Sequence, residues 1–302
     1  LGKEFEKERK RQLKGSLKNL RESGGTVVFH AGEVHYATTE LLNDKPLDIE
    51  QQRKVQYQQS CKRQKITKAD LDNALKNFSQ SRLIVLGDTI VDQYIACDTL
   101  GISAEAPVLV VRELKTKEFV GGASIVAAHA RYLGSQCHYL SVVGDDSQAE
   151  LIRDKPDHYN VSHTLIPDSS RPTTFKIRYM VENQKLFRVS RLREHSLSED
   201  VEKKVIDKLR YLAPQVDGIL VSDFSYGVIT DRILNELYAL KDQHNLKLFG
   251  DLQCSSQVGN VSKFKNFDLL TPTEKECRIA IGNRDDSVEW VANLLMQMSN
   301  TK

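Results

Sequence analysis

Carboxylate side chains and paired glycines stand beside apolar runs of this chain, where α/β proteins place ligand-binding groups. Asp88 and Asp92 follow the β-rich run 82–87, and Gly121 and Gly122 precede an Ala-rich segment. A carboxylate at the carboxyl end of a parallel strand can accept hydrogen bonds from sugar hydroxyls. Paired glycines let the backbone approach a ligand, and the start of a helix presents free N–H groups. A turn with a helix cap explains the same residues, so the chemistry depends on the elements that position them.

Further charged residues fall into two groups later in the chain. Three acidic residues follow apolar runs: Asp223, Asp251 and Glu276. Three basic residues lie where polar and apolar side chains alternate, in the segment 173–190: Lys176, Arg178 and Arg188. In isolation, strand-end turns and helix caps explain the carboxylates, and exposed strand positions explain the cations. A site is predicted only if the fold brings these groups together.

The elements around these residues predict an α/β protein. Short apolar runs typical of strands occur at 82–87, 138–143, 218–222, 246–250 and 268–271. Helical patterns separate several of them, at 122–133, 201–212 and 229–244. Strands that alternate with helices of this length favour a parallel sheet with helices on both faces. Two segments break the rhythm, 106–115 and 173–190, because their side chains alternate with period two. They predict antiparallel strands outside the main sheet, with a turn at 182–184, which suggests a small β lid.

Composition excludes several classes of protein. The chain has 302 residues and a net charge of +2, which gives no reason to expect nucleic-acid binding. No stretch approaches the roughly 18 apolar residues of a membrane-spanning helix. The five cysteines are far apart and form no Cys-x-x-Cys pair, so we expect neither a disulfide scaffold nor a zinc site. This cysteine usage favours a cytoplasmic location. The chain contains neither a GxGxxG fingerprint nor a GxxxxGK[ST] phosphate loop.

The order of the motifs resembles the PfkB/ribokinase-like sugar kinases over about residues 81–285. The motifs are GDTIVDQY, SAEAPVLVV, EFVGGASIVAAHARYLG, VVGDD, RPTTFKIRY, KLFRVS, ILVSDFSYGVIT and LLTPTEKE. Within that family the chain is most similar to heptose-phosphate kinase modules of surface-polysaccharide biosynthesis. The resemblance implies a ribokinase-like fold with a small antiparallel β lid, and transfer of a phosphoryl group from ATP with Mg²⁺.

The resemblance also implies roles for individual residues. Those expected at the sugar or its phosphate are Asp92, Gly121, Gly122, Lys176, Arg178 and Arg188. Those expected near the nucleotide phosphates are Asp223, Asp251 and Glu276, with Glu276 organising Mg²⁺ through water. Four positions depart from the family pattern: Ile125 for Asn, Tyr226 for Lys, Leu252 for Pro and Thr273 for Asn.

The family's catalytic base lies in a GxGD-type motif, and no such motif occurs in this chain. Because the chain also begins with Leu1, we expect a fragment of a longer protein. The alternative is a catalytically degenerate sugar-kinase fold that binds a ligand or acts as a scaffold. A purely structural protein built around the charged N-terminal residues is a weaker third interpretation.

The N-terminal stretch has a resemblance of its own. Residues 24–43 (GGTVVFHAGEVHYATTELLN) are similar to the end of cytidylyltransferase-like nucleotidyltransferases. This implies that Thr38 and Thr39 contact nucleotide phosphates at a helix start. The expected organisation is a nucleotidyltransferase-like tail at 1–45, a linker at 46–80 and a PfkB-like kinase domain at 81–302. Such a protein is bifunctional, acts on small molecules, and pairs through its lid strands as a homodimer.

Overall fold

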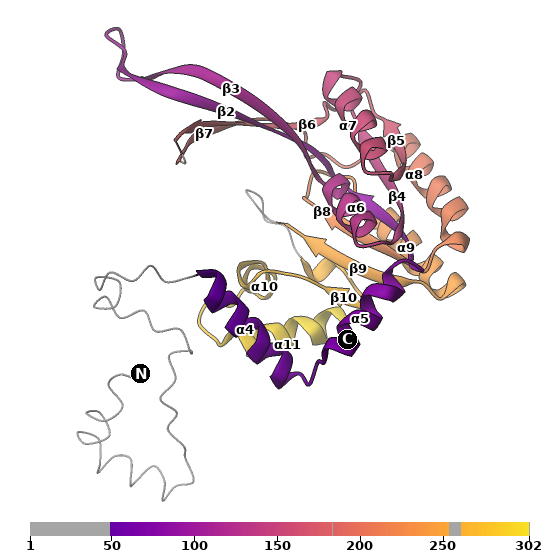
Figure 1. The fold of residues 1–302 in the computed structure, drawn as a ribbon. Helices are drawn as coiled ribbons and strands as arrows, with labels where there is room; N and C mark the ends of the chain where they lie inside the picture. The colour runs from indigo at the N-terminus through magenta and orange to yellow at the C-terminus, as the bar shows by residue number, and fades with distance from the viewer. Residues whose placement is uncertain (1–48, 183, 254–260, 302) are drawn as a thin grey trace, which may run out of the picture. The chain divides into compact units, whose positions relative to one another are not determined.

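The computed structural model describes residues 49–182, 184–253 and 261–301 (Figure 1). The chain divides into two units, Leu1–Thr67 and Lys68–Lys302. In the first unit the described element is helix α4 (Ile49–Arg63), whose Gln- and Lys-rich sequence lacks an apolar face. The predicted nucleotidyltransferase tail, with Thr38 and Thr39, lies outside the described residues.

A six-stranded sheet forms the centre of the second unit, in the order β10-β9-β8-β1-β4-β5. Every pairing in it is parallel, as the alternation of strands and helices predicts. The central strand β1 has four buried residues in a row at its end, typical of a strand covered on both faces. The strands are β1 (Arg82–Gly87), β4 (Gln136–Val143), β5 (Ser162–Pro167), β8 (Gly218–Asp223), β9 (Lys247–Leu252) and β10 (Leu269–Leu270).

Helices cover both faces of this sheet and enclose two apolar clusters. Ile84 and Leu86 belong to one cluster, and Val85, which lies between them, belongs to the other. Alternate side chains of a strand point to opposite faces, so β1 contributes to both cores. Buried side chains of α8 and α9 join the first cluster, and those of α6 and α7 join the second. The helices are α5 (Lys68–Phe78), α6 (Ala123–Tyr132), α7 (Ser147–His158), α8 (Glu199–Leu212), α9 (Asp231–His244), α10 (Glu274–Ile281) and α11 (Val288–Ser299).

The predicted lid is a separate four-stranded sheet in the order β3-β2-β6-β7, extending from the body as an arm (Figure 1). Its strands are β2 (Thr89–Ile102), β3 (Leu109–Gly122), β6 (Thr174–Val181) and β7 (Gln184–Arg191). The outer pairs are antiparallel as expected, but the central pair, β2 and β6, runs parallel. The reason is that β2 follows β1 and β6 follows β5, so both leave the same edge of the main sheet.

The C-terminal helix corrects one packing expectation. Trp290, Leu294 and Met298 share a helical face and suggest core positions, yet Trp290 is 47% exposed and Met298 44%. The buried positions of α11 are Val291, Leu295 and Ser299. Each buried position of α11 therefore lies one residue after a position that the apolar spacing of the sequence suggests.

Candidate active site

One face of the lid sheet gathers most of the predicted sugar-site residues. Asp92 is in register with Lys176 on β6, and Tyr94 is in register with Arg178. Arg188 on β7 stands opposite Arg178. Residues directly opposite one another share a face of a sheet, so these side chains form a single surface. The strand β3 adds Phe119 beside Asp92 and Lys117 beside Tyr94. We call this surface the basic lid face: Asp92, Tyr94, Lys117, Phe119, Lys176, Arg178 and Arg188.

Asp92 lies at the centre of the basic lid face and forms an ion pair with Arg178. The Arg178 guanidinium also lies over the Tyr94 ring, 5.1 Å from its centroid. Tyr94 and Phe119 meet edge to face, with centroids 5.7 Å apart. Asp92, Tyr94, Lys117 and Phe119 line a hollow of about 470 Å³. This surface combines a hydrogen-bond acceptor for hydroxyls, apolar ring surface and cations that suit an oxyanion.

The glycine pair lies where the lid joins the main sheet. A Cβ at position 121 would lie 3.0 Å from Oδ2 of Asp92. Gly122 has a φ of +62°, and a Cβ there would overlap the carbonyl oxygen of Asp88. That same oxygen accepts a hydrogen bond of 2.9 Å from the Ala123 N–H at the start of α6. Glycine is thus required at 122 for the backbone path, and at 121 the missing Cβ leaves room for the Asp92 carboxylate.

Lys176 connects the lid with the loop that follows β8. Its side chain is 4% exposed, and its Nζ lies 5.0 Å from the ring centroid of Tyr226 and 5.6 Å from that of Phe224. The electron-rich faces of the rings stabilise the ammonium in this buried position. Tyr226, which stands where the family often has Lys, contributes its ring to this contact, and its buried hydroxyl has no hydrogen-bond partner in the described residues.

Asp88 acts differently from the neighbouring Asp92. Its carboxylate is 1% exposed and accepts hydrogen bonds from the backbone N–H groups of Phe224 (2.7 Å), Tyr226 (3.3 Å) and Val228 (3.4 Å). Burial and the nearby Asp223 carboxylate raise the pKa of Asp88 to about 7, although these hydrogen bonds lower it. Asp88 therefore holds the loop that carries the two aromatic rings under Lys176.

The expected phosphate-site carboxylates lie at the carboxyl ends of adjacent strands. Asp223 ends β8, is buried, and pairs with Lys263 of the short 3-10 helix η3 (Val261–Lys263). Asp251 lies in β9 opposite Ser222, and its Oδ1 accepts a hydrogen bond of 2.8 Å from the Thr271 hydroxyl. The two carboxylates thus share the edge of the sheet where open α/β folds bind ligands.

Glu276 closes this edge from the first turn of α10. Its Oε2 accepts hydrogen bonds from the N–H (2.7 Å) and the hydroxyl (2.8 Å) of Thr273. Thr273 in return caps the helix, with its hydroxyl accepting from the Glu276 N–H at 3.4 Å. Thr273, at the position where the resemblance leads us to expect Asn, thus orients Glu276.

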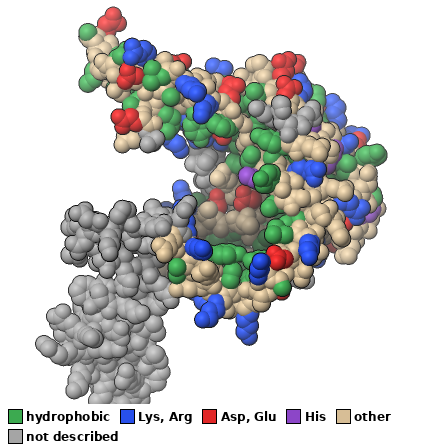
Figure 2. All heavy atoms as spheres, in the orientation of Figure 1, with side chains coloured by type: hydrophobic (Ala, Val, Ile, Leu, Met, Phe, Trp, Pro, Cys, Tyr) green, Lys and Arg blue, Asp and Glu red, His purple; other side chains and the backbone are tan. Residues whose placement is uncertain are grey.

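The carboxylates at this edge differ from a preformed metal cage. Within the described residues, no three His, Cys, Asp or Glu side chains are grouped to hold a metal ion by themselves. Mg²⁺ bound with a nucleotide takes one or two carboxylates, and phosphate and water oxygens complete its shell. Asp223, Asp251 and Glu276 supply such carboxylates at a single edge. Each of them could supply one carboxylate to Mg²⁺ that arrives with a nucleotide, and the strand register places Asp223 and Asp251 on opposite faces of the sheet. Figure 2 shows the molecule hollowed beneath the lid, with acidic side chains inside the hollow.

Sequence reasoning missed four residues of this region: Tyr94, Lys117, Phe119 and Lys263. The first three alternate with Asp92 or Gly121 along β2 and β3, so their spacing carried a signal. Tyr94 was missed because residues 89–102 did not stand out as a strand, and Lys117 and Phe119 because the strand predicted at 106–115 extends to Gly122. Lys263 gave no signal, because it lies in an irregular segment after β9.

Comparison with known proteins decides the family. The profile described as "pfkB family carbohydrate kinase" matches residues 80–302. The chain belongs to the pfkB family of carbohydrate kinases. The relatives it matches include proteins named Bifunctional protein HldE. That of Helicobacter pylori (strain P12) is 28% identical over 221 residues, which are 73% of this chain and 47% of the relative. That of Desulfatibacillum aliphaticivorans is 31% identical over 229 residues, which are 74% of this chain and 46% of the relative.

Solved structures confirm the fold of this pfkB-family chain. The Arabidopsis thaliana ribokinase solved with ribose and ATP superposes with a TM-score of 0.55 at 15% identity, covering 74% of this chain and 72% of that one. The predicted ribokinase-like α/β class is therefore confirmed. The chain spans about half the length of the curated relatives it matches. Among the described residues, no helix combines the length and apolar character needed to cross a bilayer.

Proposed function

We propose that this pfkB-family chain phosphorylates a hydroxyl of a sugar phosphate, of the heptose-phosphate kind, with ATP as donor. The observation that carries the proposal is the basic lid face, where Asp92 stands among Lys117, Lys176, Arg178 and Arg188. A single carboxylate among several cations suits a substrate that has both hydroxyls and a phosphate. The resemblance to heptose-phosphate kinase modules supports the choice of sugar.

Each residue of the basic lid face has a separate task in this proposal. The Asp92 carboxylate accepts hydrogen bonds from sugar hydroxyls, and its ion pair with Arg178 fixes its orientation. Lys117, Lys176 and Arg188 attract the phosphate of the substrate. Tyr94 and Phe119 pack against the carbon skeleton, and Gly121 with Gly122 lets the sugar approach the backbone.

The nucleotide lies at the carboxyl edge in this proposal, near Asp223, Asp251 and Glu276. These carboxylates would hold Mg²⁺ together with water and the phosphates of ATP. When bound, Mg²⁺ neutralises negative charge on the phosphates during transfer. Thr273 orients Glu276 for this contact through its two hydrogen bonds. We assign no residue of this chain as the base that removes the hydroxyl proton, since the chain contains no GxGD motif.

We further propose that the kinase domain, residues 81–302, belongs to a bifunctional cytoplasmic protein of nucleotide-sugar biosynthesis for surface polysaccharide. The printed names of the HldE relatives contain the word bifunctional. A nucleotidyltransferase-like tail at 1–45, with Thr38 and Thr39 near nucleotide phosphates, and a linker at 46–80 complete this organisation. The free thiols Cys61, Cys97, Cys137 and Cys277 are in keeping with a reducing compartment.

A homodimer through the lid strands is part of the same proposal. Phe187 and Val189 of β7 are 51% and 42% exposed. Phe187 stacks on Tyr179, with ring centroids 4.6 Å apart, on the face opposite the basic lid face. Pairing of two lids would bury this apolar surface. Sedimentation velocity should give twice the chain mass, and the Phe187→Glu variant should sediment as a monomer; a monomeric wild type would contradict the pairing.

The kinase proposal is tested by sugar-dependent ADP release. A heptose phosphate should stimulate release, and the unphosphorylated heptose should do so at least about tenfold less well. Asp92→Asn should lower kcat/KM about 100-fold, because it removes one acceptor oxygen and the negative charge that pairs with Arg178. Lys176→Gln should raise KM for the phosphorylated sugar about tenfold and leave KM for the unphosphorylated sugar nearly unchanged. Lys204→Gln, at an exposed position of α8, is the matched control.

One outcome would overturn the proposal in favour of the degenerate-fold alternative. That outcome is calorimetric binding of the sugar phosphate and of ATP to the chain while no sugar tested stimulates ADP release. Binding that is unaffected by Asp92→Asn and Lys176→Gln would also overturn it, because the basic lid face would then not be the substrate site.

A further inference from the structure

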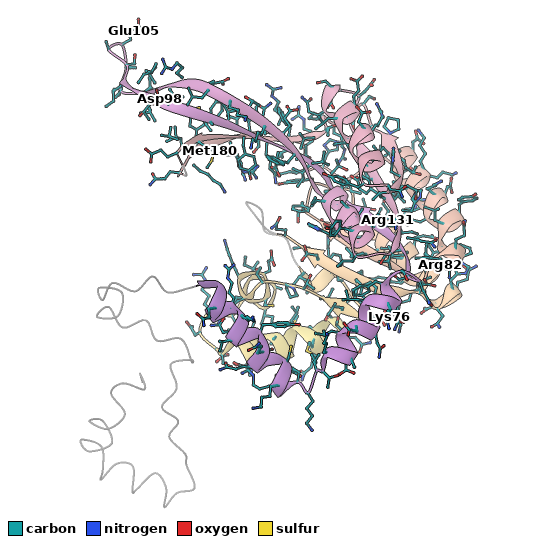
Figure 3. All side chains as sticks on the ribbon, in the orientation of Figure 1. Lys76, Arg82, Asp98, Glu105, Arg131 and Met180 are labelled. Atoms are coloured by element: carbon teal, nitrogen blue, oxygen red, sulfur yellow. The ribbon has the colours of Figure 1, made fainter. Side chains whose placement is uncertain are left out.

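A second hollow lies at the opposite edge of the main sheet, away from the candidate active site. It has a volume of about 360 Å³ and is lined by residues at the starts of β1, β4 and β5 and in the segment before β8. Figure 3 labels Arg82 and Arg131 on this side of the body, far from Asp98 and Glu105 at the tip of the lid. A hollow of this size is in the range of small-molecule sites. No task in the proposed kinase reaction falls to these residues.

Arg131 is the principal charged group of this hollow. It lies at the C-terminal end of α6 and is half-buried. Its Nε donates a hydrogen bond of 3.1 Å to the carbonyl oxygen of Asn160, which fixes the plane of the guanidinium. In the described part of the chain no carboxylate pairs with Arg131, so the N–H groups of its two terminal nitrogens remain available. A planar fork of N–H donors is the geometry that binds carboxylate and phosphate.

The surroundings of Arg131 keep this positive charge uncompensated. The lining residue Arg82 is paired with the Asp217 carboxylate at 2.7 Å. His138 bonds to the hydroxyls of Ser162 (3.0 Å) and Thr164 (2.9 Å) through its two ring nitrogens. Burial lowers the pKa of His138 to about 4, and the nearby Lys208 and His163 side chains lower it further. Around neutral pH the hollow is thus walled by a neutral imidazole, a neutral ion pair and the guanidinium of Arg131.

The remaining walls are polar amides on one side and apolar side chains on the other. Gln136 and Gln215 supply amide groups, and Leu83, Leu212 and Val216 supply apolar surface. Such walls suit a ligand that has a short carbon skeleton as well as a charged end.

We propose that this hollow binds a small organic molecule through a carboxylate or phosphate group held by Arg131. The guanidinium binds the oxyanion, and the apolar wall covers the carbon skeleton. The Gln136 amide donates to a remaining oxygen, as does the second N–H of Gln215, whose first N–H donates to the Tyr211 carbonyl oxygen at 2.8 Å. We call it the amino-edge site. It is independent of the proposed kinase reaction, because the kinase residues lie at the carboxyl edge and on the lid.

The test uses the full chain labelled with ¹⁵N and two probes, inorganic phosphate and butyrate, each followed by amide chemical shifts. The expected result is that at least one probe shifts the side-chain amides of Gln136 and Gln215 in a saturable way. Saturation by phosphate alone identifies a phosphate ester as the ligand class, and saturation by butyrate alone identifies a carboxylic acid.

Variants separate the amino-edge site from the basic lid face. Arg131→Gln should weaken the probe-induced shifts at Gln136 and Gln215 roughly tenfold in Kd, because it removes the charged fork. Arg131→Lys should weaken them to a lesser extent, since it keeps the charge and loses the fork. Arg153→Gln on α7 is the matched control, and Lys176→Gln should leave these shifts unchanged while it alters any shifts on β6. Unfolding midpoints establish that each variant is folded.

Two results would overturn the proposal. One is an absence of saturable shifts at Gln136 and Gln215 with either probe in the wild-type chain. The other is wild-type affinity in a folded Arg131→Gln variant, which would show that the guanidinium does not hold the anion. Neither result bears on the kinase proposal, whose test depends on Asp92 and Lys176.

Discussion

Two aspartates only four positions apart have different properties because their neighbours differ. Asp88 is enclosed by backbone N–H groups and lies near another buried carboxylate, so its charged form is disfavoured despite its hydrogen bonds. Asp92 is partly exposed and forms an ion pair with the Arg178 guanidinium. Asp92 is therefore suited to accept hydrogen bonds from a substrate, whereas Asp88 is suited to position a loop.

The titration of Asp88 gives a prediction at the residue scale. Its pKa is about 7 in the folded chain and about 3.9 in an unfolded one. Between these values the folded state binds the extra proton, so Asp88 contributes stability below about pH 4 that is lost as the pH rises through about 7. The free energy of unfolding of the wild type, minus that of Asp88→Asn, should fall from about pH 5 to about pH 8 by at most about 1.4 kcal/mol per pH unit. Urea unfolding at several pH values measures this difference.

Subtracting the free energy of unfolding of Asp88→Asn from that of the wild type removes the contribution of His138 to the pH dependence. The lowered pKa of His138, about 4, makes the folded chain gain stability as the pH rises toward about 6.5. Wild type and Asp88→Asn both carry His138, so its opposing contribution cancels in the difference. A difference that stays constant over the same pH range would contradict the raised pKa of Asp88. A Lys204→Gln variant, which changes no buried group, should give a constant difference from wild type.

At the scale of elements, the junction of β3 with α6 brings the lid and the main sheet together. Gly122→Ala should destabilise the chain by roughly 3 kcal/mol, since a Cβ meets the Asp88 backbone and the left-handed φ adds about 1–2 kcal/mol. Gly121→Ala should cost under about 1 kcal/mol, because the Cβ meets a carboxylate that can move. It should instead raise KM for the sugar phosphate, since that carboxylate belongs to Asp92. Urea unfolding and ADP-release kinetics separate the two effects.

Gly282→Ala provides the control for this pair. Gly282 has a φ of +71°, and a Cβ added there would have nothing within 4 Å, so the substitution carries only the cost of the backbone conformation. A loss of stability for Gly122→Ala no larger than that for Gly282→Ala would show that the predicted overlap with Asp88 is relieved. An unchanged KM in Gly121→Ala would separate Gly121 from the sugar site.

The main sheet could be predicted from the sequence, and the lid only in part. Strands such as β1 and β8 are continuous apolar runs, and a helical pattern follows β8. These signals are local. In β2 the burial alternates only weakly and the register shifts twice against β3, so no simple period marks the strand. The direction of β6 relative to β2 depends on where both strands leave the main sheet, which is a property of the fold.

The same distinction applies to the candidate site. Asp92, Lys176 and Arg178 could be predicted because each lies in a motif with a recognisable order. Their convergence on one face could not, since it depends on the pairing of β2 with β6, strands far apart in the sequence. In α11 the apolar residues form two stripes, and only packing against α10 and η3 shows that Val291 and Leu295 are the buried ones.

At the scale of the whole molecule, the second unit carries its own core. The two apolar clusters consist of residues between Ile84 and Leu295, and the described part of the first unit, residues 49–67, contributes none of them. The main sheet, its helices and the lid all fall within Lys68–Lys302. The candidate active site and the amino-edge site lie at opposite edges of that one sheet. The unit therefore contains every described group that either proposal needs.

This arrangement predicts that residues 68–302 fold without residues 1–67. A truncated chain of residues 68–302 should unfold cooperatively, with a midpoint within about 3 °C of that of the full chain, since a loss of even about 1 kcal/mol would shift it by about 2–4 °C. Differential scanning calorimetry measures the midpoint. A matched truncation at residue 90 removes β1 as well and should abolish the transition, because β1 contributes to both apolar clusters. A midpoint lowered by about 10 °C or more in the chain 68–302 would contradict the independence of the unit. Such a result would show that residues 1–67 stabilise the unit, and that the domain boundary lies closer to the N-terminus.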